Sequence, residues 1–201
     1  MGYLSGMRRT IAAVVLCGLS ACAQQVTLGY APPAPPQRSD AGPVIGSVSA
    51  SDQRNEADPT WIGAIRGGFG NPLKVLHNSQ SLAQSVTTAF RDALRARGLL
   101  AAESTGRFDI NVAIAKFQST QMVRREAEVD LTMTVTDKSN RATVYRDEAN
   151  IDLVTGSVLA LDTGVLASAS DLQAVTQTAL GQAIDRLLDN PAFLAAIRNR
   201  G

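Results

Sequence analysis

The sequence predicts an α+β fold in two layers, a largely antiparallel sheet with two main helices packed on one of its faces. Three observations support this class. Apolar and polar residues alternate in three runs between residues 108 and 153, as in strands with one buried face. Two longer stretches, 80–97 and 170–188, repeat apolar residues at helical spacing. The order of strand, hairpin, helix, three strands and helix favours one domain with its helices on one face of the sheet.

The first 22 residues are arranged like a secretory signal. Arg8 and Arg9 precede the apolar run 10–18, which is too short to span a bilayer as a stable helix. Residues 19–22, Leu-Ser-Ala-Cys, resemble the lipobox of bacterial lipoproteins. The resemblance implies that the Cys22 sulfur takes a diacylglyceryl group, that the chain is cut before Cys22, and that the new amino terminus is acylated, for example by palmitate. An ordinary signal with an incidental cysteine is the alternative.

The residue after Cys22 bears on which membrane the lipoprotein is expected to occupy. Ala23 stands where, in lipoproteins with this motif, an Asp favours retention in the inner membrane. The resemblance therefore implies an outer-membrane lipoprotein on the periplasmic face of a Gram-negative envelope. Residues 1–21 are expected to be the signal peptide, with Met7 as an alternative start.

Residues 22–42 are expected to be the lipidated cysteine and a Pro-rich tether, and residues 43–201 a single periplasmic domain. Four of the eight prolines fall in residues 31–36. Such runs prefer an extended geometry of ~3.1 Å per residue, so the tether is expected to reach up to about 60 Å. A proline motif that binds another protein is the alternative to a plain spacer.

Composition excludes several functional classes. Residues 1–21 carry two arginines and no acids, which leaves 17 basic and 18 acidic side chains in the mature chain. This near-neutral balance has no basic footprint for nucleic acid, and no nucleic-acid partner is expected. Cys17 leaves with the signal, so a lipidated Cys22 leaves no disulfide and no thiolate metal site. His77 is the sole histidine. The sequence therefore predicts no enzyme, no metal and no cofactor.

A glycine-rich loop joins the second and third predicted strands, both of which are short. Residues 44–50 alternate as a strand, and the strands 61–65 and 72–76 flank the loop. The loop lacks the Gly-Lys-Ser/Thr ending of a phosphate-binding loop. Its functional interpretation is a ligand or partner loop, and the alternative is a flexible hairpin whose aromatic residues cap the core. The candidate residues are Trp61, Arg66 and Phe69.

The first long helix is predicted over residues 80–97. Asn78 or Ser79 is the expected N-cap, and Gly98 the expected left-handed stop with Leu99 folding back on the helix. His77, just before the helix and without a second histidine or cysteine, is expected to be structural. The apolar stripe consists of Leu82, Val86, Phe90 and Leu94.

Three strands are predicted at 108–114, 127–135 and 145–153, with a turn at 137–140 between the last two. A loop of small residues at 155–169 leads to the second helix. Asn190 and Pro191 end that helix and start a short last one.

The motifs in the first half of the chain resemble a known family. Asp52-Gln53-Arg54 at a strand end, Ile62-Gly63 in a short segment, and Leu94 to Leu99 closing a helix are similar to YajG-type uncharacterised bacterial lipoproteins. More distantly they resemble the lipoprotein auxiliary components of envelope transport systems. The resemblance covers about Val44 to Leu100 by motif and the remainder by element order. It brings no catalytic residues.

Three functions compete. The first is a non-enzymatic accessory of an envelope transport or assembly system, held to the membrane by the Cys22 lipid and acting on an envelope protein partner. The second is a binding module for a lipid, glycan or peptide. The third is a hydrolase that uses carboxylates, and it requires a pKa raised by burial. Its candidate residues are Asp52, Glu128 and Asp130.

Overall fold

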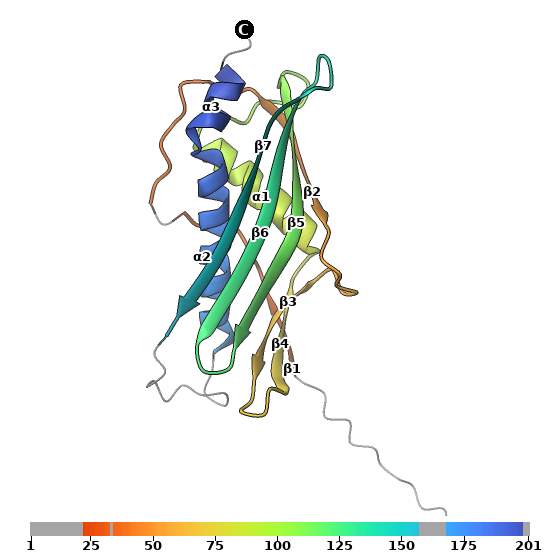
Figure 1. Ribbon diagram of the computed structural model, residues 1–201, viewed down its shortest axis with the longest axis vertical. Coiled ribbons are helices and arrows are strands. Elements are labelled where there is room, and N and C mark those ends of the chain that lie inside the picture. Colours follow the sequence, from red (N-terminus) through yellow and green to blue (C-terminus); the bar gives the residue numbers. More distant parts are fainter. Residues whose placement is uncertain (1–21, 33, 157–167, 199–201) are drawn as a thin grey trace, which may run out of the picture.

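The computed structural model describes residues 22–32, 34–156 and 168–198 and places them in one seven-stranded sheet with three helices (Figure 1). The mixed α+β class is thus confirmed. The predicted signal peptide lies outside the described residues. The elements are β1 (Cys22–Val26), β2 (Ile45–Asp52), β3 (Trp61–Arg66), β4 (Pro72–Asn78), α1 (Leu82–Ala96), β5 (Phe108–Gln121), β6 (Arg125–Asp137), β7 (Thr143–Thr155), α2 (Ala169–Leu188) and α3 (Pro191–Arg198).

The sheet is mixed, which corrects the prediction of a largely antiparallel one. Its order is β1-β4-β3-β5-β6-β7, with β2 also paired to β5. The pairs β1–β4, β2–β5 and β3–β5 are parallel, and β3–β4, β5–β6 and β6–β7 are antiparallel. The sequence pattern could not distinguish these arrangements, because period-two alternation shows which side chains share a face but not the direction of the neighbouring strand.

Strand β5 changes partner along one edge. Its first half, Phe108–Ile114, pairs with β2, and its last residues, Ser119–Gln121, pair with β3. Strands β2 and β3 therefore lie end to end along β5 and run in the same direction. The buried face of β5 and β6 follows the predicted alternation, and its residues are Phe108, Ile110, Val112, Ile114, Ala127, Val129, Leu131, Met133 and Val135.

Local hydrogen bonds define both ends of α1. Ser81 is the N-cap, because its hydroxyl accepts from the Gln84 amide at 3.3 Å, so the expectation of Asn78 or Ser79 is wrong. The predicted stop is confirmed. Gly98 has φ +71, its amide donates to the Arg95 carbonyl, and the Leu99 amide donates to the Leu94 carbonyl. These two bonds form the Schellman arrangement, which favours glycine at the left-handed position.

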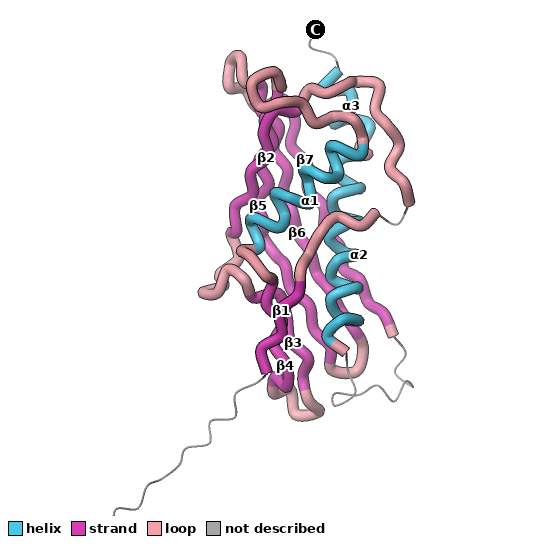
Figure 2. The backbone as a smooth tube through the Cα atoms, turned by 180° about the vertical axis from the view of Figure 1, so that it is seen from behind, coloured by secondary structure: helices cyan, strands magenta, loops and turns pink. Residues whose placement is uncertain are grey.

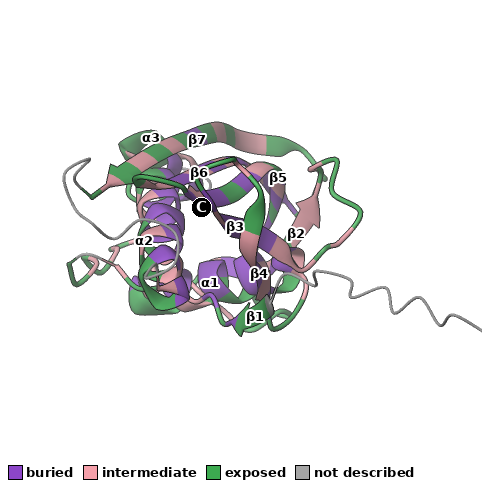
Figure 3. Ribbon diagram, turned by 90° about the horizontal axis from the view of Figure 1, so that it is seen from below, coloured by how far each residue is buried: buried purple, intermediate pink, exposed green. Residues whose placement is uncertain are grey.

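The helices contact different parts of the sheet. Helix α2 contacts β6 and β7, helix α1 contacts β2, and the two helices touch each other. Figure 3 shows the sheet curving around both helices. Helix α3 packs on β7, where the rings of Phe193 and Tyr145 are 5.7 Å apart. Among the described residues, no helix is long and apolar enough to cross a membrane.

The segment after Cys22 differs from the predicted tether. Residues 22–26 form β1, an edge strand parallel to β4, and the side chains of Val26 and Leu28 are buried. The Tyr30 hydroxyl donates to Asp185 of α2 at 2.6 Å. The following residues 34–40, here called the strap, cross the corner between α2 and α3 before β2 begins (Figure 2). The strap is held by a 2.9 Å hydrogen bond from the Ser39 amide to the Arg97 carbonyl.

Candidate functional site

The structure separates the predicted loop residues. Arg66 ends β3 and its guanidinium donates to the Gly70 carbonyl at 3.1 Å, across the hairpin from Phe69. The Phe69 side chain is fully exposed at the tip of the hairpin. Trp61 lies at the other end of β3, paired with His77 of β4. Arg66 and Phe69 are therefore brought together with the start of β1, where Cys22 lies beside Lys74, while Trp61 belongs to a different part of the sheet.

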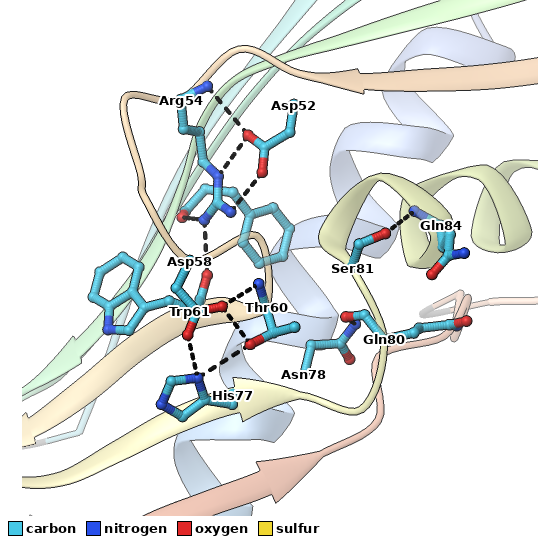
Figure 4. Close-up of polar contacts among 11 residues, drawn as sticks. Asp52, Arg54, Asp58, Thr60, Trp61, His77, Asn78, Gln80, Ser81 and Gln84 are labelled. Atoms are coloured by element: carbon cyan, nitrogen blue, oxygen red, sulfur yellow. Dashed lines mark hydrogen bonds and ion pairs between the residues drawn. The ribbon is translucent and has the colours of Figure 1, made fainter.

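His77 takes part in a small polar cluster beside Trp61 (Figure 4). Its Nδ1 atom lies 3.0 Å from Asp58 Oδ2 and 3.2 Å from the Thr60 hydroxyl. Hydrogen bonds from the Thr60 side chain and amide hold the pKa of Asp58 below its usual value. A catalytic triad places the acid and the nucleophile on opposite ring nitrogens, whereas both groups here meet the same nitrogen. The cluster thus ties β4 to the loop before β3.

The Asp52–Arg54 pair fills the point where β5 changes partner (Figure 4). Two Arg54 nitrogens donate to the Asp52 carboxylate at 2.9 and 2.8 Å. The Arg54 Nη1 atom donates to the carbonyls of Trp61 and Phe117, both at 2.9 Å. Burial works against the charge of Asp52, but the hydrogen bonds from Arg54 hold the pKa of that carboxyl below its usual value. Arg54 therefore satisfies backbone carbonyls that the change of strands would leave unpaired.

The remaining carboxylates of the hydrolase hypothesis lie on the polar face of β6. The Lys116 ammonium is 2.9 Å from Glu128, and hydrogen bonds from Lys116 and then Gln118 hold the pKa of Glu128 below its usual value. Asp130 lies two residues along the same face. A general acid at neutral pH needs a raised pKa, whereas the pKa of Glu128 is lowered. Among the described residues, no group of three or more His, Cys, Asp or Glu side chains could hold a metal ion.

A pocket of about 480 Å³ lies under the strap, at the end of the sheet opposite to the Phe69 hairpin. One wall is the strap and the other is the corner of α2 and α3. The charged side chains of Arg97, Asp185 and Asp189 are part of its lining. Neither Trp61 nor Arg66 nor Phe69 lines this pocket. The other lining residues are Ala34, Pro35, Pro36, Gln37, Arg38, Ser39, Asp40, Leu188, Leu194 and Arg198.

Beside the pocket, Arg97 is a buried cation in a closed network. Its Nε atom donates to Asp189 at 2.7 Å, its Nη2 atom to Asp185 and Asp189 at 2.8 Å, and its Nη1 atom to the Tyr30 hydroxyl at 2.8 Å. The Arg97 residue is only 1% exposed. Burial, and then the hydrogen bond to Asp185, raises the pKa of Tyr30 to about 12. The network joins four segments: the chain after β1, the end of α1, the end of α2 and the start of the α2–α3 connection.

The chemistry of the pocket suits binding. Its described lining contains no histidine or cysteine, and its arginines and aspartates are equal in number. Pro35, Pro36, Leu188 and Leu194 offer apolar surface next to these charges. Apolar surface with a few placed polar groups is the usual composition of a ligand site.

Sequence reasoning missed Tyr30, Arg97, Asp185 and Asp189. The buried position of Arg97 depends on residues that are 88 and 92 positions away along the chain, which no local pattern indicates. One signal was present for the segment before the strap. Val26, Leu28 and Tyr30 alternate with polar or small residues, which is a strand-like pattern inside a supposed spacer.

Comparisons with known proteins identify a family of lipoproteins and a solved structure with a similar fold. A family model described as an uncharacterized lipoprotein matches residues 32–198. No curated protein matches the chain. A crystal structure from Xanthomonas campestris, assigned to the family DUF330, is 17% identical with a TM-score of 0.56 and covers 86% of this chain and 96% of that one. This likeness indicates that the two proteins share a fold.

Two further solved structures have TM-scores below 0.5. A putative lipoprotein from Caulobacter crescentus is 16% identical with a TM-score of 0.40, covering 55% of this chain and 80% of that one. The PelC dodecamer from Paraburkholderia phytofirmans is 16% identical with a TM-score of 0.43, covering 75% of this chain and 92% of that one.

Proposed function

Because the chain belongs to a family of uncharacterised lipoproteins, we propose that it is a lipid-anchored envelope protein that works by binding and not by catalysis. The family match confirms the resemblance to YajG-type lipoproteins that the sequence motifs indicated. The proposed anchor is the Cys22 thioether, and the proposed location is the periplasmic face of the outer membrane, in keeping with Ala23. The proposed role is that of a non-enzymatic accessory in envelope transport or assembly.

The observation that carries this proposal is the pocket under the strap. It lies at the end of the sheet away from Cys22, where a partner in the periplasm has access to it. A segment of an envelope protein is the proposed occupant. A lipid, glycan or free peptide is the second candidate, favoured by the apolar residues Pro35, Pro36, Leu188 and Leu194 next to the charged ones.

The test is cross-linking in cells that make the full-length lipoprotein. A photo-reactive phenylalanine analogue replaces Arg38, an exposed residue of the strap. The same analogue at Arg91, exposed on α1 and outside the pocket, is the matched control. One dominant envelope protein captured from position 38 and not from position 91 supports the accessory role. Lipid or glycan captured there instead supports the binding module, and equal capture from both positions contradicts both.

The anchor has its own test. The intact mass of the protein isolated from membranes is expected to show cleavage before Cys22 and the addition of acyl chains. Cys22→Ser is expected to abolish both. Two or three long chains hold a protein at a membrane effectively permanently, since each buried methylene stabilises attachment by ~0.8 kcal/mol. A mature protein without lipid would remove the anchor from the proposal.

A further inference from the structure

We propose that the end of the domain that carries Cys22 is a membrane-contact surface, on which the protein stands directly on a lipid bilayer. This basal end consists of the start of β1, the β3–β4 hairpin tip 67–71, the β5–β6 turn 122–124 and residues 154–156 at the end of β7. The inference rests on the proposed lipid anchor and adds a second set of membrane contacts made by side chains.

The first step is the position of Cys22. Strand β1 starts at this residue, and its Cα partner is Lys74 on β4. The last pair of the β3–β4 hairpin joins Arg66 to Pro72, only two residues before Lys74. No spacer therefore separates the anchor position from the folded sheet. A lipid on Cys22 would bring the hairpin tip to within about 10 Å of the bilayer surface, given a rise of ~3.3 Å per strand residue.

The second step is where apolar surface is exposed. The exposed large apolar residues in the part of the chain that the structure describes are Phe69, Met122, Val123 and Val154. Strand register places all of them at the basal end. Ile65 pairs with Gln121, so the β3–β4 tip lies beside the β5–β6 turn, and Arg125 pairs with Thr155, so the end of β7 is adjacent (Figure 1).

The third step is the conformation of the tip that carries Phe69. The Gly67 amide donates to the Asn71 carbonyl and the Gly70 amide to the Gly67 carbonyl, both at 2.8 Å. Gly70 has φ +80, a conformation that glycine adopts without strain. The turn thus holds the aromatic ring away from the core. An aromatic ring on a protruding tip is suited to the interface of a bilayer, where apolar side chains leave water.

The fourth step is charge. Among the described residues, the basal end carries the basic residues Arg66, Lys74, Arg124 and Arg125, against Glu126 and Asp171. The Arg125–Asp171 ion pair, at 2.9 Å, also places the start of α2 at this end. The described part of this end is therefore net positive on a near-neutral chain, which suits anionic lipid headgroups.

The arrangement also sets an orientation. Strand β6 has 13 residues and runs from the basal end to the opposite end, about 43 Å away at ~3.3 Å per residue. The pocket under the strap lies at that opposite end. A domain standing on its basal end would hold the pocket well above the bilayer.

The test measures the depth of single spin labels on the lipidated full-length protein in vesicles of phosphatidylethanolamine and phosphatidylglycerol. The mature lipoprotein has no free thiol once Cys22 is lipidated, so each introduced cysteine is labelled alone. Phe69→Cys reports the basal end, and Ser104→Cys, on the exposed loop before β5, is the matched control at the opposite end. The label at 69 is expected to gain contact with dissolved oxygen and lose contact with a water-soluble nickel complex, while the label at 104 keeps full contact with nickel.

Each other outcome overturns the proposal. A label at 69 as open to nickel as the label at 104 shows that the basal end stands clear of the bilayer. A label at 69 shielded from both oxygen and nickel points to a protein contact at this end. The intact mass of the same preparation separates the two proposals, because a lipidated protein with a water-exposed label keeps the anchor and loses the contact surface, whereas an unlipidated protein loses both.

Discussion

The two ends of this domain are built in opposite ways. At the end with the pocket, a buried arginine, two aspartates and a tyrosine join segments that are distant in the sequence, through Arg97, Asp185, Asp189 and Tyr30. At the basal end, backbone pairing holds the strands, and the large apolar side chains at the tips point into solvent. The first end therefore depends on buried side-chain contacts, and the second leaves its large apolar tip residues exposed.

The contrast indicates which residues are free to serve contact with another surface. A side chain that is fully exposed contributes little to the free energy of folding, so its apolar character at one end needs a reason outside the fold. A closed network of buried charges has a structural reason, because each charge requires its partners. Mutations at the two ends should therefore separate stability from membrane contact.

The largest effect is expected where the basal strands join the sheet. Strand β3 meets β5 through only three residue pairs, and a Cβ on Gly63 would lie 2.2 Å from the Ser119 carbonyl oxygen. Gly63→Ala is expected to lower the free energy of unfolding by about 4 kcal/mol, because a backbone clash adds to the lost strand pairing. Urea denaturation of the purified protein measures this change, and hydrogen exchange shows whether β3 opens first.

Gly68→Ala is the control in the same hairpin, since nothing lies within 4 Å of a Cβ at that position. It is expected to change stability by less than about 0.5 kcal/mol. Equal effects of the two substitutions would show that close approach at Gly63 does not hold the basal strands.

The second effect concerns the opposite end. Arg97→Met keeps much of the side-chain volume but leaves Asp185 and Asp189 without their cation. A loss of about 3 kcal/mol is expected, at the low end for a broken buried pair because Asp189 is half exposed. Arg95→Met, which removes an exposed ion pair with Asp92 one turn away, is expected to cost less than about 1 kcal/mol. Similar losses of unfolding free energy in both variants would mean that the burial of Arg97 does not add to stability.

A third, smaller effect tests how the segment after β1 is attached. Tyr30→Phe removes the hydroxyl between Asp185 and Arg97 and is expected to cost about 1.5 kcal/mol at neutral pH. The pKa of Tyr30 is raised to about 12 in the folded protein, so the folded state holds this proton more tightly than the unfolded state. The stabilisation is complete below about pH 10 and is lost as pH rises toward about 12. Denaturation at about pH 9 and about pH 11.5 should show a steeper decline for the natural protein than for Tyr30→Phe, and parallel declines would contradict this assignment.

The smallest effect on stability, and the sharpest contrast between the ends, is expected at Phe69. Phe69→Ser should change the free energy of unfolding by less than about 0.5 kcal/mol, because the ring touches nothing that the fold requires. Thermal or urea denaturation in solution measures this. A loss above about 1 kcal/mol would show that the tip packs against the domain and would weaken its role as a surface for lipid.

Sequence reasoning recovered the local features of the fold and missed the contacts between distant segments. The alternation in β5 and β6, the apolar stripe of α1 and the stop at Gly98 were predicted, because each depends on residues within one or two turns or strand repeats. The tether was predicted from its prolines, yet residues 22–26, which lie before those prolines, form β1 by pairing with β4. Of the candidate loop, Arg66 and Phe69 lie together, whereas Trp61 does not.

The class of fold and the faces of its elements followed from the amino-acid pattern, since periodicity and glycine at a positive φ are local properties of the chain, while the lipobox at Cys22 stays a prediction. The parallel direction of β2 and β3 along β5, the burial of Arg97 and the gathering of apolar tips at the end where β1 begins became visible in the folded protein. The physical reason is distance along the chain. Tyr30 and Asp185 are 155 residues apart, and their contact exists because folding brings their segments together.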